Sequence, residues 1–163
     1  MNVKELLAKG RAQLENQSLG RLETEILLGE ALGVSRAWLY ANPEQTPASK
    51  HCTKFLDLVR RRKNGEPIAY LAGYREFWSL PLKVTADVLI PRPETELLVE
   101  TALTFFPKDA AWRIADLGTG SGAIALAIAS ERPLCEIHAT EYSEAALRVA
   151  QENGRTIAPG SGR

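Results

Sequence analysis

Hydrophobic positions in the first sixty-odd residues recur at the spacing of amphipathic helices. Three groups of apolar residues carry the pattern: Leu6, Leu7 and Leu14, then Leu19, Leu22, Ile26, Leu28 and Leu32, then Phe55, Leu56 and Val59. Gly33 follows the second group and is suited to end a helix, and a loop with two prolines spans residues 42–47. The pattern predicts a small bundle of three short helices that bury their apolar stripes on one another.

The pattern changes after Pro67, where apolar residues fall into short strand-like pieces. These are Phe77, Trp78, Leu80, Leu82, Val84, Val88, Leu89 and Ile90, with breaks at Pro81 and at Ala86-Asp87. They predict a β-hairpin or a pair of edge strands. A proline at 93 followed by acids favours the start of a helix, which continues to a break at Pro107.

From Trp112 onward the chain alternates between strand and helix. We expect a strand over residues 112–117, a glycine turn over 118–122, a helix over 123–130 and a second strand over 136–140, with Ser143 capping another helix. This order opens a doubly wound α/β sheet. The predicted organisation is therefore a helical domain (1–64), a linker with a β-hairpin (65–92) and the incomplete start of a Rossmann-like domain (93–163), whose last six residues form a frayed end.

Composition and charge narrow the function classes. Twenty basic and twenty acidic residues cancel, so the overall charge favours neither nucleic acid nor an anionic membrane as the partner. No apolar run is long enough to span a bilayer, and the first residues lack the apolar core of a signal peptide. Cys52 and Cys135 are isolated, which disfavours a disulfide scaffold or a zinc site and fits the reducing cytoplasm.

The run 60–63 (Arg-Arg-Arg-Lys) is the one local block of like charge. Cations in the last turn of a helix interact favourably with its dipole, and Asn64-Gly65 is a suitable cap. We favour a solvated helix end, with a contact to nucleic acid or the ribosome as the alternative.

Candidate chemistry gathers where the two expected parallel strands end. The predicted ligand-binding residues are Asp116, Gly118, Thr119, Gly120, Ser121, Gly122 and Glu141. Glycines permit positive φ angles and a close approach of ligand to backbone, and ligands of open α/β sheets bind beyond the carboxyl ends of the strands. Glu141, at the end of the second strand, is placed to accept hydrogen bonds from both hydroxyls of a ribose.

Two cofactor classes compete for this loop. Gly118, Gly120 and Ala123 satisfy the dinucleotide pattern GxGxxG/A, which makes an NAD(P)-dependent oxidoreductase the alternative, and a plain glycine turn without ligand is the third interpretation. Asp116 lies two residues before the first glycine, where its charge would repel a pyrophosphate. S-adenosylmethionine has no phosphate, and its sulfonium and ammonium groups are attracted to acids. The loop therefore favours S-adenosylmethionine and a methyltransferase.

Longer motifs resemble one family. Residues 65–73 (GEPIAYLAG) with 75–78 (REFW), and above all 89–96 (LIPRPETE), resemble the linker, hairpin and most distinctive segment of release factor glutamine methyltransferases. Residues 116–122 and Glu141 match that family's cofactor loop and ribose-binding acid. The resemblance implies a helical domain that meets the release factor, and transfer of a methyl group to the glutamine nitrogen of a Gly-Gly-Gln motif. It also implies that Thr95 and Glu96 lie near the methionine end of the cofactor.

The family's substrate-holding motif, Asn-Pro-Pro-Tyr, is not in this sequence. Its only Asn-Pro is Asn42-Pro43, which is followed by glutamate in the helical region. We therefore assign no catalytic residue and expect the chain by itself to be inactive and prone to self-association, with a folded helical region. A non-catalytic fragment that binds a release factor is the remaining alternative; no metal, nucleic acid or membrane is expected as a partner.

Overall fold

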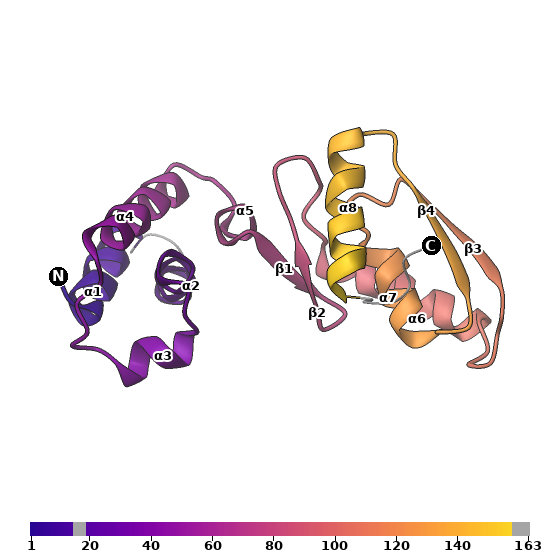
Figure 1. Cartoon of the computed structure of the whole chain (residues 1–163), viewed down its shortest axis with the longest axis horizontal. Coiled ribbons are helices and arrows are strands. Elements are labelled where there is room, and N and C mark those ends of the chain that lie inside the picture. Colours follow the sequence, from indigo (N-terminus) through magenta and orange to yellow (C-terminus); the bar gives the residue numbers. More distant parts are fainter. Residues whose placement is uncertain (15–18, 158–163) are drawn as a thin grey trace. The chain divides into compact units, whose positions relative to one another are not determined.

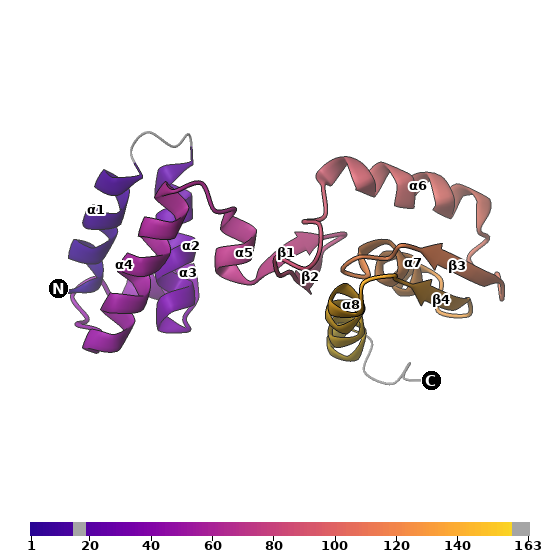
Figure 2. The same cartoon turned by 90° about the horizontal axis from the view of Figure 1, so that it is seen from above.

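The computed structural model describes residues 1–14 and 19–157, and the chain divides into two compact units, Met1–Ala72 and Gly73–Arg163 (Figures 1 and 2). The fold is mixed α/β, with a helical first unit and a second unit that holds a hairpin and a parallel strand pair. The predicted frayed end, residues 158–163, lies outside the described residues. Within those residues, no helix is both long and apolar enough to cross a membrane.

The described residues of the first unit form five helices: α1 (Val3–Gln13), α2 (Gly20–Leu32), α3 (Arg36–Ala41), α4 (Ser49–Lys63) and α5 (Ile68–Ala72). α1, α2 and α4 pack on one another around a core that includes Leu6, Leu27 and Phe55. Gly10 lets α1 approach closely, because a Cβ there would lie 2.6 Å from a Thr24 methyl and 2.7 Å from the Phe55 ring. The predicted helical bundle is confirmed.

The helix ends follow local sequence signals. Asn2 and Glu5 form a reciprocal capping box at the start of α1. Gly33 ends α2 with a φ of 69°, as its position in the sequence predicts, and the Ser35 hydroxyl accepts a hydrogen bond from the Trp38 amide at the start of α3.

The basic end of α4 is largely engaged in ion pairs. These join Arg60 to Asp57 (2.6 Å), Arg61 to Glu66 (2.5 Å) and Arg62 to Glu23 (2.9 Å). Hydrogen bonding to Arg61 lowers the pKa of Glu66 below its usual value. The pairing gives this helix end a structural role.

Two elements differ from the sequence-based expectation. α3 and α5 are short helices in segments whose patterns were too brief to predict, so the part of the bundle that the structure describes has five helices where the sequence predicts three. α5 belongs to the first unit, where it packs on α2, and the structural division falls after Ala72 although the sequence placed its first boundary after residue 64.

The second unit begins with an antiparallel hairpin of β1 (Tyr74–Phe77) and β2 (Leu80–Lys83). Its two-residue turn places Trp78 at a φ of 52° and Ser79 at 58°, a left-handed conformation in which asparagine and glycine are the usual residues. The Glu96 carboxylate accepts a hydrogen bond from the Trp78 amide at 2.9 Å and helps to hold the turn. Val88, Leu89 and Ile90, expected as strand-like, lie outside any strand.

A short 3₁₀ turn (Pro93–Thr95) leads into α6 (Glu96–Phe105), so the helix start predicted at the proline is confirmed. There follow β3 (Arg113–Leu117), α7 (Ala123–Glu131), β4 (Glu136–Thr140) and α8 (Glu144–Ile157). β3 and β4 pair in parallel, with Leu117 opposite Thr140 (Figure 1). This β-α-β crossover confirms the predicted start of a Rossmann-like fold and brings both strand ends to one edge.

The strand pair leaves apolar surface uncovered. Among the described residues β3 pairs with β4 alone, and the Leu117 side chain at its end is 78% exposed. A cleft of about 680 Å³ runs along β4, lined in part by Leu126, Ile137 and Leu147. An open strand edge beside apolar surface is a template for pairing with another chain.

We therefore expect the polypeptide of residues 1–163 to self-associate as its concentration rises. Size-exclusion chromatography with light scattering measures this directly. Ala115→Lys places a charge on the exposed face of β3 and should reduce association. A monomer at every concentration would contradict the prediction.

Candidate functional site

The glycine loop joins β3 to α7 at the carboxyl edge of the strand pair. Gly118, Gly120 and Gly122 have φ angles of 78°, 57° and 84°, which a side chain would strain. The amides of Gly118 and Thr119 both donate to the Thr140 carbonyl at 2.9 Å. The loop is thereby fixed to the end of β4, directly before Glu141.

Asp116 is half-buried near the end of β3. One of its carboxylate oxygens accepts a hydrogen bond from the Thr119 hydroxyl at 2.7 Å. Thr119 itself is 8% exposed, so its side chain is fixed by packing as well as by this bond. The contact holds the aspartate against the first turn of the loop.

Glu141 accepts three backbone hydrogen bonds. Its Oε2 receives the Gly120 amide at 2.9 Å, and its Oε1 receives the amides of Tyr142 at 2.8 Å and Ser143 at 3.1 Å. The Gly120 bond is the largest cause of a pKa lowered from the usual glutamate value, followed by the bond from Ser143. Glu141 is consequently an anion at neutral pH and is tied to the middle of the glycine loop.

The seven residues predicted from the sequence lie together at one edge of the strand pair: Asp116 in β3, five in the loop 118–122, and Glu141 directly after β4. Direct contacts join Glu141 to Gly120 and Asp116 to Thr119, while Ser121 is buried behind the loop at 3% exposure. Thr95 and Glu96 lie at the start of α6, and the described contact of Glu96 is with the hairpin turn. The arrangement offers two carboxylates and the backbone of a glycine-rich loop to a ligand with hydroxyl and cationic groups.

Asn153 is the site-supporting residue that sequence reasoning missed. This side chain of α8 is 2% exposed; its amide nitrogen donates to the Ser121 carbonyl at 2.8 Å and to the Lys83 carbonyl at 3.0 Å. Its oxygen accepts the Lys83 amide at 2.7 Å. A signal was available, because Asn153 continues the buried helical stripe of Ala146 and Val149, where a polar residue needs a partner.

The described residues hold no cluster of three or more histidine, cysteine, aspartate or glutamate side chains placed to bind a metal ion. Both cysteines are free thiols.

Comparisons with known proteins agree on both units. Residues 5–73 match the family model of the PrmC N-terminal domain, and residues 93–159 match that of the methyltransferase small domain. A protein of Coxiella burnetii is 53% identical over 156 residues, which are 95% of this chain and 56% of that protein. A protein of Escherichia coli is 46% identical over 158 residues, 97% of this chain and 57% of the relative.

A third relative, from Burkholderia pseudomallei, is 50% identical over 144 residues, which cover 88% of this chain and 50% of that protein. All three relatives carry the name release factor glutamine methyltransferase. The chain thus spans about half the length of the curated relatives that it matches.

Proposed function

Because this chain belongs to the release factor glutamine methyltransferase family, matching its N-terminal part, we propose that its second unit holds S-adenosylmethionine for methylation of a release factor. The methyl group would go to the glutamine side-chain nitrogen of a Gly-Gly-Gln motif. The first unit would recognise the release factor. The enzyme would act in the cytoplasm, where translation termination takes place. One observation carries the proposal most directly: the anionic Glu141 bonded to the cofactor loop.

The residues present fit this cofactor. S-adenosylmethionine carries the methyl group on a positively charged sulfur. The carboxylates of Asp116 and Glu141 would stabilise the cationic and hydroxyl groups of this cofactor. The charge of Asp116 opposes the pyrophosphate of a dinucleotide, which weighs against the NAD(P)-dependent alternative. An acid at the position of Glu141 suits the ribose of either cofactor and does not separate the two. Asp116, the loop 118–122 and Glu141 are the residues that we propose hold the cofactor.

Glu141 has limited capacity for a ribose in the described arrangement. A carboxylate offers about four lone-pair sites, and three are taken by the amides of Gly120, Tyr142 and Ser143. One ribose hydroxyl therefore finds an open acceptor, whereas the second must share or displace a backbone donor. Among these three donors glycine permits the widest range of backbone angles, so we propose that the loop adjusts at Gly120 when cofactor binds.

None of the 163 residues is assigned to catalysis. The Asn-Pro pair at 42–43 serves the helical unit, where the Asn42 side chain donates to the Trp38 carbonyl at 2.9 Å at the end of α3. An amide nitrogen is a weak nucleophile that must be oriented towards the methyl group. We propose that residues 1–163 bind cofactor and release factor without methyl transfer, so binding assays test them best.

Glu141→Ala should weaken binding of S-adenosylhomocysteine by roughly tenfold, because charge-assisted hydrogen bonds to the ribose are lost. Isothermal titration calorimetry measures the change. Glu144→Ala is the matched control, since Glu144 is an exposed carboxylate in the following helix. Equal affinities of the parent and Glu141→Ala chains would remove Glu141 from the site, and binding of NADH in place of S-adenosylhomocysteine would favour the oxidoreductase.

The affinity should also depend on pH in one direction. Because the folded structure lowers the Glu141 pKa, the carboxylate remains charged through mildly acidic conditions. Affinity should hold as pH falls to the ordinary glutamate range and decline only below it, as Glu141 takes up its proton. Calorimetry across an acidic series checks this, with loss of binding near neutrality as the contrary outcome.

A further inference from the structure

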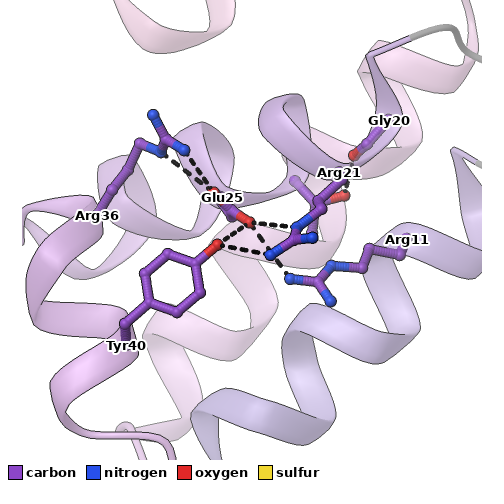
Figure 3. A network of polar contacts seen from close by, with 7 residues as sticks. Arg11, Gly20, Arg21, Glu25, Arg36 and Tyr40 are labelled. Atoms are coloured by element: carbon purple, nitrogen blue, oxygen red, sulfur yellow. Dashed lines mark hydrogen bonds and ion pairs between the residues drawn. The ribbon is translucent and has the colours of Figure 1, made fainter.

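A second polar cluster lies in the helical unit, on the surface of α1, α2 and α3 (Figure 3). At its centre the Glu25 side chain of α2 is only 1% exposed. Three arginines, Arg11, Arg21 and Arg36, bring a nitrogen within 3.3, 3.3 and 2.7 Å of its carboxylate, and the Tyr40 hydroxyl also donates to it. Burial alone would raise the pKa of Glu25, but the bonds from Tyr40, Arg36 and Arg21 together hold it below its usual value.

Among the described residues, the cluster sets three cations against a single carboxylate. Glu25 receives all of its described bonds from these four side chains, and a carboxylate has about four lone-pair sites, so it is saturated. Each guanidinium has five N–H donors, and the described bonds use a minority of them. The side chains of Arg11, Arg21 and Arg36 remain 39%, 71% and 52% exposed, so the excess charge faces solvent.

A hollow of about 290 Å³ opens over this charge. Its lining combines the two most exposed arginines with apolar and aromatic groups: Leu19, Arg21, Leu22, Glu25, Arg36 and Tyr40. Leu19 is 57% and Tyr40 51% exposed. Planar guanidinium groups match a carboxylate in paired hydrogen bonds. The leucine and the phenol ring offer contact to the aliphatic part of an acidic side chain and to its apolar neighbours.

The helical unit as a whole also carries a positive net charge. Residues 1–72 contain eleven basic and eight acidic side chains, a formal net charge of +3, whereas residues 73–163 contain nine and twelve, a net charge of −3. The balance over the whole chain therefore conceals a basic helical unit. Such a charge attracts an acidic partner and speeds its encounter.

We propose that this hollow, the arginine hollow, docks an acidic segment of a partner protein in which an aspartate or glutamate lies beside an apolar residue. The inference rests on the proposed function for the identity of the partner, a release factor. Glu25 is a positioning residue, because it fixes the guanidinium groups from behind and itself lies beneath the surface. The two leucines of the lining favour the aliphatic neighbours of an acidic side chain over a nucleic acid strand, whose bases stack on aromatic rings.

Arg21→Gln tests the surface with little risk to the fold. Arg21 is the most exposed arginine of the three, and Glu25 keeps Arg11, Arg36 and Tyr40. In the full chain it should weaken binding of a purified release factor about tenfold, as loss of a charged contact at an interface does, and flatten the dependence of affinity on salt. Lys50→Gln, which removes an exposed cation of α4, is the matched control and should change affinity less than twofold.

Three binding partners distinguish the proposal of the arginine hollow from the proposed function. The release factor, a peptide of alternating glutamate and leucine, and a single-stranded RNA are titrated against the parent and both variants by fluorescence anisotropy, with circular dichroism as the check on folding. Equal affinity of parent and Arg21→Gln for both the release factor and the peptide overturns the inference. So does a selective loss of RNA binding.

Failure of the release factor to bind the parent chain counts against the proposed function. The acidic peptide still decides the inference in that case, because its binding to the parent and its loss in Arg21→Gln would support the arginine hollow without a release factor.

Discussion

Glu25→Gln is expected to lower the free energy of unfolding of the helical unit by about 3 kcal/mol. Removing one partner of a buried ion pair costs about 3–5 kcal/mol because the remaining charges are left uncompensated. Here the three arginines are partly exposed and regain water, which places the effect at the low end of that range. The glutamine also replaces one carboxylate oxygen with an NH₂ group. This group cannot accept the hydrogen bonds that the guanidinium groups donate.

Glu30→Gln provides the matched control on the same helix. Glu30 pairs with Lys54 at 2.9 Å, but both side chains are exposed, at 38% and 49%, and such pairs contribute about 0–1 kcal/mol. Hydrogen exchange of amides in α1, α2 and α4, followed in urea, reports the helical unit separately from the rest of the chain. Similar losses in both variants would contradict a special role for Glu25.

The same substitution has a predicted pH dependence. The folded structure lowers the Glu25 pKa, so the network's contribution is fully present above the unfolded-state pKa and is lost as pH falls through the folded value. The stability difference between parent and Glu25→Gln should therefore be largest near neutral pH and shrink in acid. Urea unfolding at a series of pH values gives this difference directly.

Elements with strong periodicity could be predicted from the sequence alone. The strand over 136–140 was predicted with the bounds that the structure shows, and the second helix with its end before Gly33, because local pattern and local stop signals agree there. The core α1–α2–α4 packing follows from the same stripes. Short helices such as α3 and α5 have too few turns to show a period, and they form because neighbouring helices cover them.

The hairpin turn shows a different limit. The strand pattern predicts a hairpin, but Trp78 and Ser79 are not residues that favour positive φ angles. Glu96, distant in sequence, supplies the hydrogen bond that supports the turn, and the Trp78 indole donates to Glu131 at 3.0 Å. Such tertiary support cannot be read from the four residues of the turn.

The candidate site also has features that the local sequence predicts and features that depend on tertiary structure. Asp116, the glycines and Glu141 were predicted because their chemistry and their place at strand ends are local features. The hydrogen bond from the Gly120 amide to the Glu141 carboxylate could not be predicted in this way. It depends on the register of the parallel strands, which sets Leu117 opposite Thr140. Glu25 resembles any exposed helical glutamate in sequence, and only the packing of three helices reveals its burial.

Asn153→Ala is expected to destabilise the second unit by about 2–4 kcal/mol, since each buried group left unsatisfied costs about 1–3 kcal/mol. The substitution removes the three hydrogen bonds of the Asn153 side chain. The Ser121 carbonyl and the Lys83 amide and carbonyl each lose their bond to this side chain. Those bonds fasten the glycine loop 118–122 and strand β2 to the same turn of α8. Loosening both should also weaken S-adenosylhomocysteine binding, although Asn153 need not touch the cofactor.

The isosteric Asn153→Asp separates positioning from packing. Its oxygen still accepts the Lys83 amide, but the lost N–H donors leave a carboxylate facing the carbonyls of Ser121 and Lys83. Volume is conserved, so any loss reflects the lost donors and the buried charge rather than a cavity. Gln151→Ala, an exposed amide on the same helix, should stay within about 0.5 kcal/mol of the parent. Differential scanning calorimetry together with S-adenosylhomocysteine titration measures both effects, and a variant at Asn153 with parental stability and affinity would exclude the residue as the anchor of the loop.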